Sequence, residues 1–349
     1  MQQGVFYALL AAATFGASTP ISKSLLGAMP PLTLAAVLYL GSGLGLSACL
    51  AVRAIRAKDQ RAGAGIVRAD LPWLLGAILF GGVAGPVLLM TGLTHTPASS
   101  ASLLLNLEGV LTAMLAWFVF KENFDRRIFA GMVLIVAGGV VLGWQGGSGL
   151  PVPWSALAIA AACLCWAIDN NLTRKVSASD AVQIAALKGL VAGSVNLALA
   201  IATGQAMPAA GAGLAAALLG FCGYGFSLVM FVLALRHLGT ARTGAYFSAA
   251  PFVGAALSVV LLKEAPTVAF WLAGALMAAG IWLHLTEHHE HKHTHEPLLH
   301  THEHVHDEHH QHEHDFDWDG QEPHAHAHRH APTTHAHPHT PDIHHRHSH

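Results

Sequence analysis

Long apolar stretches, separated by short polar or Pro/Gly-containing breaks, recur along the chain from its start to residue 286. A helix needs about 20 mostly apolar residues to cross a hydrocarbon core of about 30 Å. The stretches have about this length, so each is predicted to be a membrane-spanning helix. We find ten of them, at residues 4–27, 32–52, 72–93, 98–120, 126–144, 153–172, 181–203, 211–235, 242–262 and 267–286.

Basic residues lie mainly in the loops that follow the second, fourth, sixth and eighth stretches, whereas the loops after the odd-numbered stretches contain only Lys263. Lysine and arginine accumulate on the cytoplasmic side of membrane proteins. We therefore expect a multi-pass protein of the inner (cytoplasmic) membrane with both termini in the cytoplasm. The basic residues of the even-numbered loops are Arg53, Arg56, Lys58, Arg61, Arg68, Lys121, Arg126, Arg127, Arg174, Lys175, Arg236 and Arg242.

The two halves of the apolar region resemble each other. Residues 92–122 align without a gap on residues 234–264, and this alignment places His95 on His237. Five predicted spans separate the two copies, so matching segments enter the membrane from opposite sides. Inverted repeats of this kind are typical of secondary transporters, in which one repeat rocks against the other around a central site.

The fold class that follows is an all-α integral membrane protein with ten transmembrane helices in two inverted five-helix repeats, at residues 4–144 and 153–286. The block PASSASLLLNLEGVLTAMLAWFVFKENFDRRIFAGMVLIVAGGVVLG and its second copy FSAAPFVGAALSVVLLKEAPTVAFWLAGALMAAGIWL resemble the EamA domain of the drug/metabolite transporter superfamily. The resemblance covers essentially residues 4–286. It implies alternating access without an ATPase part, often coupled to protons, for small solutes of many kinds.

One position departs from the family's pattern. Many relatives have a proline after the glutamate of the fourth span, where this chain has Gly109, whereas the second copy keeps Pro251. We therefore expect the helix bend at Gly109 to differ from that of the family.

Three ionisable residues lie inside predicted spans: Glu108, Asp169 and Lys188. Such groups are costly in a bilayer unless they are paired or line a cavity, so each is a candidate for the transport pathway. At about 1.5 Å per residue, Lys188 lies roughly 12 Å from the cytoplasmic end of its span, with Glu108 about 6 Å deeper and Asp169 about 6 Å shallower. Lys188 can therefore pair with either carboxylate and change partner between two states. Glu108 is the expected proton carrier.

Asp169 is followed by Asn170 and Asn171, which places three oxygen-bearing side chains near the end of one span. These side chains can bind a cation at the mouth of a cavity. They can equally satisfy backbone groups that become free where the helix ends. Glu108 matches a residue common in EamA sequences with diverse substrates, so the resemblance implies a role in the shared mechanism.

The composition changes sharply after residue 286. Overall 53% of the residues are hydrophobic and 11% are charged, which is typical of a membrane protein. Residues 1–286 hold 15 Lys and Arg against 8 Asp and Glu, whereas residues 287–349 hold 3 against 12, together with 24 of the 27 histidines. Few apolar residues and no apolar period predict a disordered tail, which the charge pattern places in the cytoplasm.

The tail offers imidazole and carboxylate ligands without cysteine or methionine, a set that favours Ni, Co, Zn or Cu as divalent ions. We expect it to be a high-capacity, weakly selective chelator, and no other cofactor is required. The candidate metal ligands are His288, His289, His291, His293, His295, His300, His302, His304, His306, His309, His310, His312, His314, His324, His326, His328 and His330.

The tail and the spans together favour a proton-driven exporter of divalent transition-metal cations, nickel or cobalt and also zinc. Histidine-tailed EamA-type carriers also resemble permeases associated with nickel and cobalt resistance in bacteria. The opposing observation is that residues 1–286 have no cluster of histidine and aspartate inside the spans.

Two alternatives stay open. The chain could export an amino acid or another small metabolite, with the tail serving only as a metal buffer or as a sensor of metal or pH. It could also be a membrane-anchored metal buffer with little transport. The partners we expect are the lipid bilayer and a small solute or metal ion, with no nucleic acid, and a homodimer is left open. No nucleophile and base are paired in the sequence, so an enzyme is not predicted.

Overall fold

The computed structural model of the protein describes most of the chain before residue 286 and four short segments after it. The chain forms two compact units, Met1–Glu287 and His288–His349, and each is described by itself. The described residues are 2–56, 66, 68–120, 126–144, 153–176, 179–285, 290–294, 299–304, 324–329 and 334–338.

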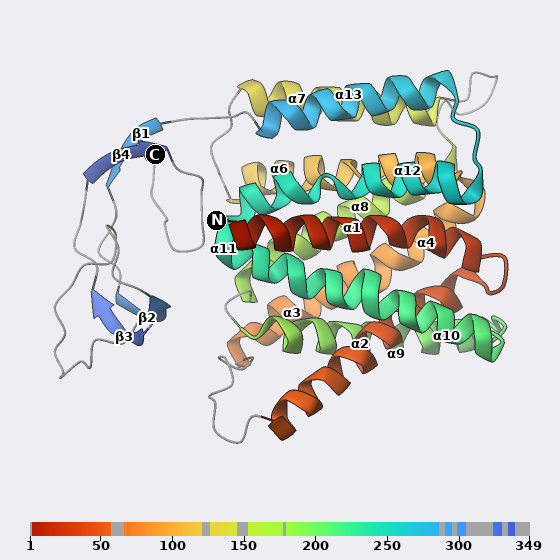
Figure 1. The fold of residues 1–349 in the computed structure, drawn as a ribbon, viewed down its shortest axis with the longest axis horizontal. Helices are drawn as coiled ribbons and strands as arrows, with labels where there is room; N and C mark the ends of the chain where they lie inside the picture. The colour runs from red at the N-terminus through yellow and green to blue at the C-terminus, as the bar shows by residue number, and fades with distance from the viewer. Residues whose placement is uncertain are drawn as a thin grey trace. The chain divides into compact units, whose positions relative to one another are not determined.

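The first unit is a bundle of helices, most of which run along a common direction (Figure 1). In chain order they are α1 (Gln2–Leu25), α2 (Pro31–Arg56), η1 (Arg68–Asp70), α3 (Leu71–Ala77), η2 (Ile78–Ala84), α4 (Gly85–His95), α5 (Ala98–Leu104), α6 (Leu107–Phe120), α7 (Arg126–Gly143), α8 (Trp154–Val176), α9 (Ala181–Ala202), α10 (Ala210–Leu219), η3 (Gly220–Phe226), α11 (Ser227–Phe247), α12 (Ala250–Leu262) and α13 (Val268–Leu285).

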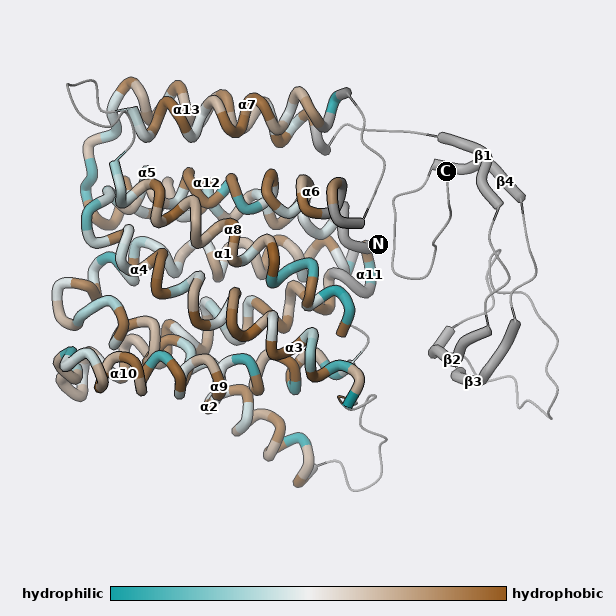
Figure 2. Tube along the Cα trace, turned by 180° about the vertical axis from the view of Figure 1, so that it is seen from behind, coloured by the Kyte–Doolittle hydropathy of each residue, from teal (hydrophilic) through white to brown (hydrophobic). Residues whose placement is uncertain are grey.

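Large apolar side chains cover the outside of this bundle. Val268, Ile55 and Val260 are 86%, 77% and 70% exposed, and the helices are mostly hydrophobic along their lengths (Figure 2). Exposed apolar side chains of this kind are suited to contact with lipid. Among the described residues, seven helical segments are long and apolar enough to cross a membrane, and three shorter apolar helices accompany them.

The seven long segments fall on the first, second, third, fourth, sixth, seventh and eighth predicted spans. The shorter helices, Phe129–Gly143, Ala250–Leu262 and Val268–Leu283, fall on the other three. A multi-pass, all-helical membrane unit is therefore confirmed, whereas the count of ten spans stays a prediction.

Corresponding helices of the two predicted repeats pack against each other. The contact between α2 and α9 joins the second and seventh predicted spans, and that between α7 and α13 joins the fifth and tenth (Figure 1). A Cβ atom on either Gly43 or Gly189 would collide with the backbone of the facing helix. These two glycines therefore let α2 and α9 approach closely, as small residues do in membrane helix pairs.

One span boundary differs from its prediction. The sequence pattern predicts a break between residues 235 and 242, whereas α11 continues to Phe247. In the first repeat, Thr96 is extended, with φ −118° and ψ 137°, because the following Pro97 disfavours helical backbone there. The second repeat has Gly239 at the matching position, so no proline ends the helix.

Two π-helical segments occupy matching places in the repeats. Ile78–Ala84 (η2) and Gly220–Phe226 (η3) are separated by 142 residues at both ends, the same offset that aligns His95 with His237. π-Helical turns are rare and occur frequently at functional sites. The third and eighth predicted spans therefore each contain a candidate functional segment.

In the second unit the structure describes the backbone of four short strands, β1 (Glu290–Thr294), β2 (Leu299–His304), β3 (His324–Arg329) and β4 (Thr334–Pro338). β1 pairs antiparallel with β4, and β2 with β3. The predicted disorder of residues 287–349 stays a prediction.

Candidate functional site

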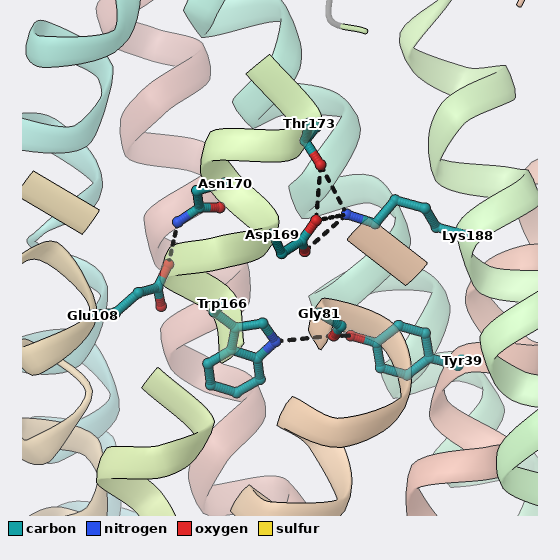
Figure 3. Close-up of polar contacts among 8 residues, drawn as sticks. All are labelled: Tyr39, Gly81, Glu108, Trp166, Asp169, Asn170, Thr173 and Lys188. Atoms are coloured by element: carbon teal, nitrogen blue, oxygen red, sulfur yellow. Dashed lines mark hydrogen bonds and ion pairs between the residues drawn. The ribbon is translucent and has the colours of Figure 1, made fainter. Parts of the chain in front are cut away.

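A buried ion pair joins α8 and α9 inside the bundle. The Lys188 ammonium donates to Asp169 Oδ1 at 2.6 Å and to Oδ2 at 2.8 Å. It also donates to Thr173 Oγ1 at 3.2 Å, and this hydroxyl donates to Asp169 Oδ1 at 2.8 Å (Figure 3). Asp169 and Thr173 lie one helical turn apart and face the same way. Both residues are buried, and each charge is paired with the other.

The start of α9 fixes where Lys188 lies. Asp180 is the N-cap residue, and its Oδ1 accepts hydrogen bonds from the backbone N–H groups of Val182 and Gln183 at 2.9 and 3.1 Å. Its Oδ2 pairs with Arg53 of α2 at 2.9 Å. This cap begins α9 at Ala181, two helical turns before Lys188.

Glu108 does not pair with Lys188 in this structure. It lies in the first turn of α6, and its Oε1 accepts a hydrogen bond from the Asn170 side chain at 2.8 Å. Glu108 and Lys188 lie on opposite sides of α8, with Asp169 between them (Figure 3). The predicted exchange of Lys188 between two carboxylates therefore stays a prediction, with the Asp169 pair formed here.

The three adjacent polar residues of α8 have separate roles. Asp169 holds Lys188, and Asn170 holds Glu108. Asn171 donates to the Ala167 carbonyl at 2.9 Å and to the Thr112 carbonyl at 3.5 Å. The sequence left open that all three side chains satisfy free backbone groups. Only Asn171 does so in this structure.

A cavity of about 90 Å³ lies beside these charges. Six aromatic rings contribute to its wall, and neighbouring rings contact one another at centroid distances of 4.9–6.0 Å. The residues that line the cavity are Phe15, Tyr39, Ser42, Glu108, Trp166, Asp169, Asn170, Ala185, Lys188, Gly189, Tyr224, Ser227, Leu228, Phe231 and Phe247.

Sequence reasoning missed the aromatic part of this cavity. The rings lie in apolar stretches, where an aromatic residue looks like any other lipid-facing or core residue. Trp166 could have been predicted, because it precedes Asp169 by three residues and therefore lies on the same face of the helix. The others come together only through the packing of helices that are distant in the sequence.

The π-helical segment η2 is held at its centre by side chains from three other helices. The Gly81 carbonyl accepts hydrogen bonds from the Tyr39 hydroxyl at 2.7 Å and from the Trp166 indole N–H at 3.0 Å (Figure 3). The Gly82 carbonyl accepts one from Asn196 at 2.9 Å. Two of these donors, Tyr39 and Trp166, also line the cavity. The cavity wall and the backbone of η2 are thus connected directly.

Within the described residues, no group of three or more His, Cys, Asp or Glu is placed to hold a metal ion. His95 contacts the Trp154 ring at 4.9 Å, and His237 contacts Tyr7 at 5.7 Å; neither lines the cavity. Among the predicted tail ligands, those on strands β1, β2 and β3 are His291, His293, His300, His302, His304, His324, His326 and His328. Those outside the described residues are His288, His289, His295, His306, His309, His310, His312, His314 and His330.

Comparison with known proteins places this arrangement in a family. The chain belongs to the EamA-like transporter family, whose model matches residues 2–144 and 153–286. The family is one of transporters, and the predicted EamA resemblance is thereby confirmed. The likeness to histidine-tailed nickel and cobalt permeases stays a prediction.

Several relatives are similar over different parts of the chain. An uncharacterized transporter of Methanothermobacter thermautotrophicus is 29% identical over 77% of this chain and 82% of its own length. A probable terminal-alkyne amino-acid exporter of Streptantibioticus cattleyicolor is 28% identical over 61% and 73%. A probable subunit of a 4-amino-4-deoxy-L-arabinose-phosphoundecaprenol flippase from Pseudomonas paraeruginosa is 43% identical over 23% and 66%.

A solved crystal structure shares the fold. Its TM-score is 0.60 at 21% identity, and the match covers 80% of this chain and 94% of the other. At this identity the likeness speaks for the arrangement of the helices only.

Proposed function

We propose that this transporter is a secondary-active exporter of a small organic solute, such as an amino acid or another metabolite with charged groups. The observation that carries this function is the composition of the cavity wall, where Lys188, Asp169 and Glu108 lie among aromatic rings. Ligand sites commonly combine such an apolar surface with a few placed polar groups. The charges can orient the solute while the rings contact its apolar part.

The size of the cavity favours a small solute. At about 90 Å³ it is well below the roughly 300–1,000 Å³ that is usual for pockets of drug-sized ligands. A solute with a few heavy atoms fits this space, whereas a larger one requires the helices to separate first. The printed name of one relative, the probable terminal-alkyne amino-acid exporter of Streptantibioticus cattleyicolor, agrees with a small organic solute.

Glu108 is the group that we propose to carry the coupling proton. It lines the cavity, and the Asn170 side chain donates a hydrogen bond to it. A carboxylate inside the membrane is costly as an isolated charge. Gain and loss of a proton at Glu108 would therefore change how strongly the cavity holds a charged solute, and so link solute export to proton entry.

A second candidate is the export of divalent transition-metal cations, nickel or cobalt and also zinc. The 24 histidines after residue 286 favour it, since imidazole suits these ions. The cavity counts against it, because the Lys188 ammonium neutralises Asp169 and would repel a divalent cation. Under the organic-solute proposal, the tail keeps a separate role as a buffer or sensor of Ni, Co, Zn or Cu.

We also retain the proposed orientation, with both termini in the cytoplasm. It rests on the placement of basic residues in alternate loops. In this orientation the end of the bundle where α9 begins faces the cytoplasm. A tail that binds metal would then bind it in the cytoplasm, before any export step.

Uptake into inverted membrane vesicles tests this function. Vesicles that hold the full chain are energised with a proton gradient and offered labelled amino acids, small carboxylates, nickel, cobalt or zinc. The expected result is gradient-dependent accumulation of one or more organic solutes and no accumulation of metal. Accumulation of nickel or cobalt without any organic solute would show that metal export is the function instead.

A further inference from the structure

The Lys188 ammonium is saturated by protein groups in this structure. An ammonium has three N–H donors. In Lys188 they are directed to Asp169 Oδ1 at 2.6 Å, Asp169 Oδ2 at 2.8 Å and Thr173 Oγ1 at 3.2 Å. Yet Lys188 and Asp169 both line the cavity in which a solute would bind. A solute can therefore reach the ammonium only by displacing one of these partners.

The identity of the partner decides which solutes can do so. Lys188 is 4% exposed and Asp169 is 7% exposed, so bulk water cannot solvate either charge when the pair opens. A buried ion pair that loses one member leaves an uncompensated charge, which is strongly unfavourable. A neutral or purely cationic solute would leave Lys188 in that state. A solute carboxylate would replace one carboxylate by another and keep the ammonium paired.

We infer that Asp169 is an internal stand-in for the carboxylate of the solute, and that binding exchanges one for the other at Lys188. This inference rests on the proposed export of organic solutes and names their shared chemical group. In this exchange Lys188 recognises the carboxylate of the solute. Asp169 excludes solutes without a carboxylate, because they cannot replace it at Lys188.

The displaced Asp169 also needs a positive partner. An α-amino acid has an ammonium two bonds from its carboxylate carbon, so one solute can satisfy both members of the opened pair. The aromatic rings then face the side chain of the solute. A zwitterionic amino acid therefore fits this chemistry better than a solute that carries only a carboxylate or only an ammonium.

Binding of matched solutes to the purified full chain tests this exchange. L-Alanine, L-leucine and L-phenylalanine are each compared with the amine that lacks the carboxylate and the acid that lacks the amino group. Each amino acid is expected to bind at least about tenfold more tightly than the corresponding amine, since the amine cannot re-pair Lys188. Lys188→Met should abolish this preference.

Asp169→Asn removes the internal competitor and is expected to tighten binding of the simple acids by about tenfold. If Asp169→Asn does not fold, Thr173→Val serves instead. That change keeps both charges but removes the hydroxyl that donates to Asp169, so acids should bind about threefold more tightly.

Two results would overturn the exchange: amines that bind the unaltered chain as tightly as the amino acids do, or a preference for amino acids over amines that survives in Lys188→Met. Either result would leave the proposed function intact if an organic solute still accumulates in vesicles. Failure of every organic solute to accumulate in vesicles would remove the proposed function itself, and this inference with it.

Discussion

A Cβ atom on Gly81 would overlap the carboxylate of Asp169, because the backbone of η2 lies directly against the ion pair of α8 and α9. The carbonyl of the same glycine accepts the hydrogen bonds of Tyr39 and Trp166. The π-helical segment, the charged pair and two aromatic residues of the cavity therefore meet at one residue. A change in any of them should be measurable at the others.

Gly81→Ala is expected to push the Asp169 carboxylate away from its place and weaken its pair with Lys188. Overpacking a tight site typically costs about 1–3 kcal/mol. We expect a lower thermal unfolding temperature and a transport rate at least about tenfold below that of the unaltered chain. Gly211→Ala is the control, since nothing lies within 4 Å of a Cβ at that position. Equal effects of the two changes would contradict the contact between Gly81 and Asp169.

Tyr39→Phe and Trp166→Phe each remove one of the two side-chain hydrogen bonds to the Gly81 carbonyl. Each single change leaves the carbonyl with the other donor, so Tyr39→Phe should cost only about 0.5–1.5 kcal/mol. Trp166→Phe should cost more, because it also removes part of a buried ring. The double change leaves a buried carbonyl without a side-chain donor and should cost more than the sum of the two. Thermal unfolding of the four proteins measures this difference. Strict additivity would show that the donors act independently.

Glu108→Gln is expected to uncouple transport from the proton gradient. Glutamine is close to a protonated glutamate in size and polarity but cannot release a proton. Exchange of labelled for unlabelled solute should therefore persist, whereas gradient-driven accumulation should be lost. Both are measured in the same vesicles. Accumulation that still follows the proton gradient in Glu108→Gln would assign the proton to another group.

Two substitutions of Asp180 distinguish the contribution of the helix cap at the start of α9 from that of the ion pair with Arg53. Asp180→Asn keeps a side chain that caps helices as well as aspartate does, and it loses only the pair with Arg53, which is 49% exposed. Asp180→Ala loses both and should cost about 0.5–2 kcal/mol. We expect Asp180→Asn to unfold close to the unaltered chain and Asp180→Ala to unfold at a clearly lower temperature. The reverse order would show that the ion pair dominates.

Two charged side chains, Lys23 in the last turn of α1 and Glu264 just after α12, form hydrogen bonds to the backbone of the turn between α4 and α5. The Lys23 ammonium donates to the carbonyls of Leu93, Thr94 and Thr96 at 2.6, 3.2 and 3.0 Å. Glu264 accepts hydrogen bonds from the backbone N–H groups of Ala98 and Ser99 at 2.8 and 2.9 Å. The lysine thus caps the end of α4 and the carboxylate caps the start of α5.

Lys23→Met should destabilise this turn by about 1–3 kcal/mol, because buried carbonyls lose a charged donor. The measurement is hydrogen exchange of the amides at residues 96–99, which should become faster. Lys263→Ala is the control, since it removes a neighbouring positive charge and leaves both caps in place. Unchanged exchange in Lys23→Met would show that the lysine is not needed to hold the turn.

The span positions were predictable because apolar length and charge placement are local properties of the sequence. The helix boundaries were less so. Pro97 stops a helix by its own geometry, whereas the continuation of α11 past residue 235 depends on the absence of such a residue at Gly239. The π-helical segments carry no sequence signal that we could use, since their carbonyls are held by side chains from distant helices.

The candidate site was predictable in its charges but not in its pairing. Glu108, Asp169 and Lys188 were evident because charged residues are rare in membrane spans. Their depths alone allowed Lys188 to reach either carboxylate. The choice of Asp169 depends on which face of α8 each residue occupies, and on the space that Gly81 leaves for the carboxylate. Both depend on packing between helices that are far apart in the sequence.

Dual-label transport by the purified membrane unit tests the central claim most directly. The chain is stopped after Thr286, which removes the histidine-rich tail, and is reconstituted into liposomes with a proton gradient across the membrane. Labelled amino acids and labelled nickel are then followed in the same vesicles. Export of organic solutes by the cavity predicts accumulation of an amino acid and none of nickel. Nickel that accumulates without the tail, with no amino acid carried, would contradict it.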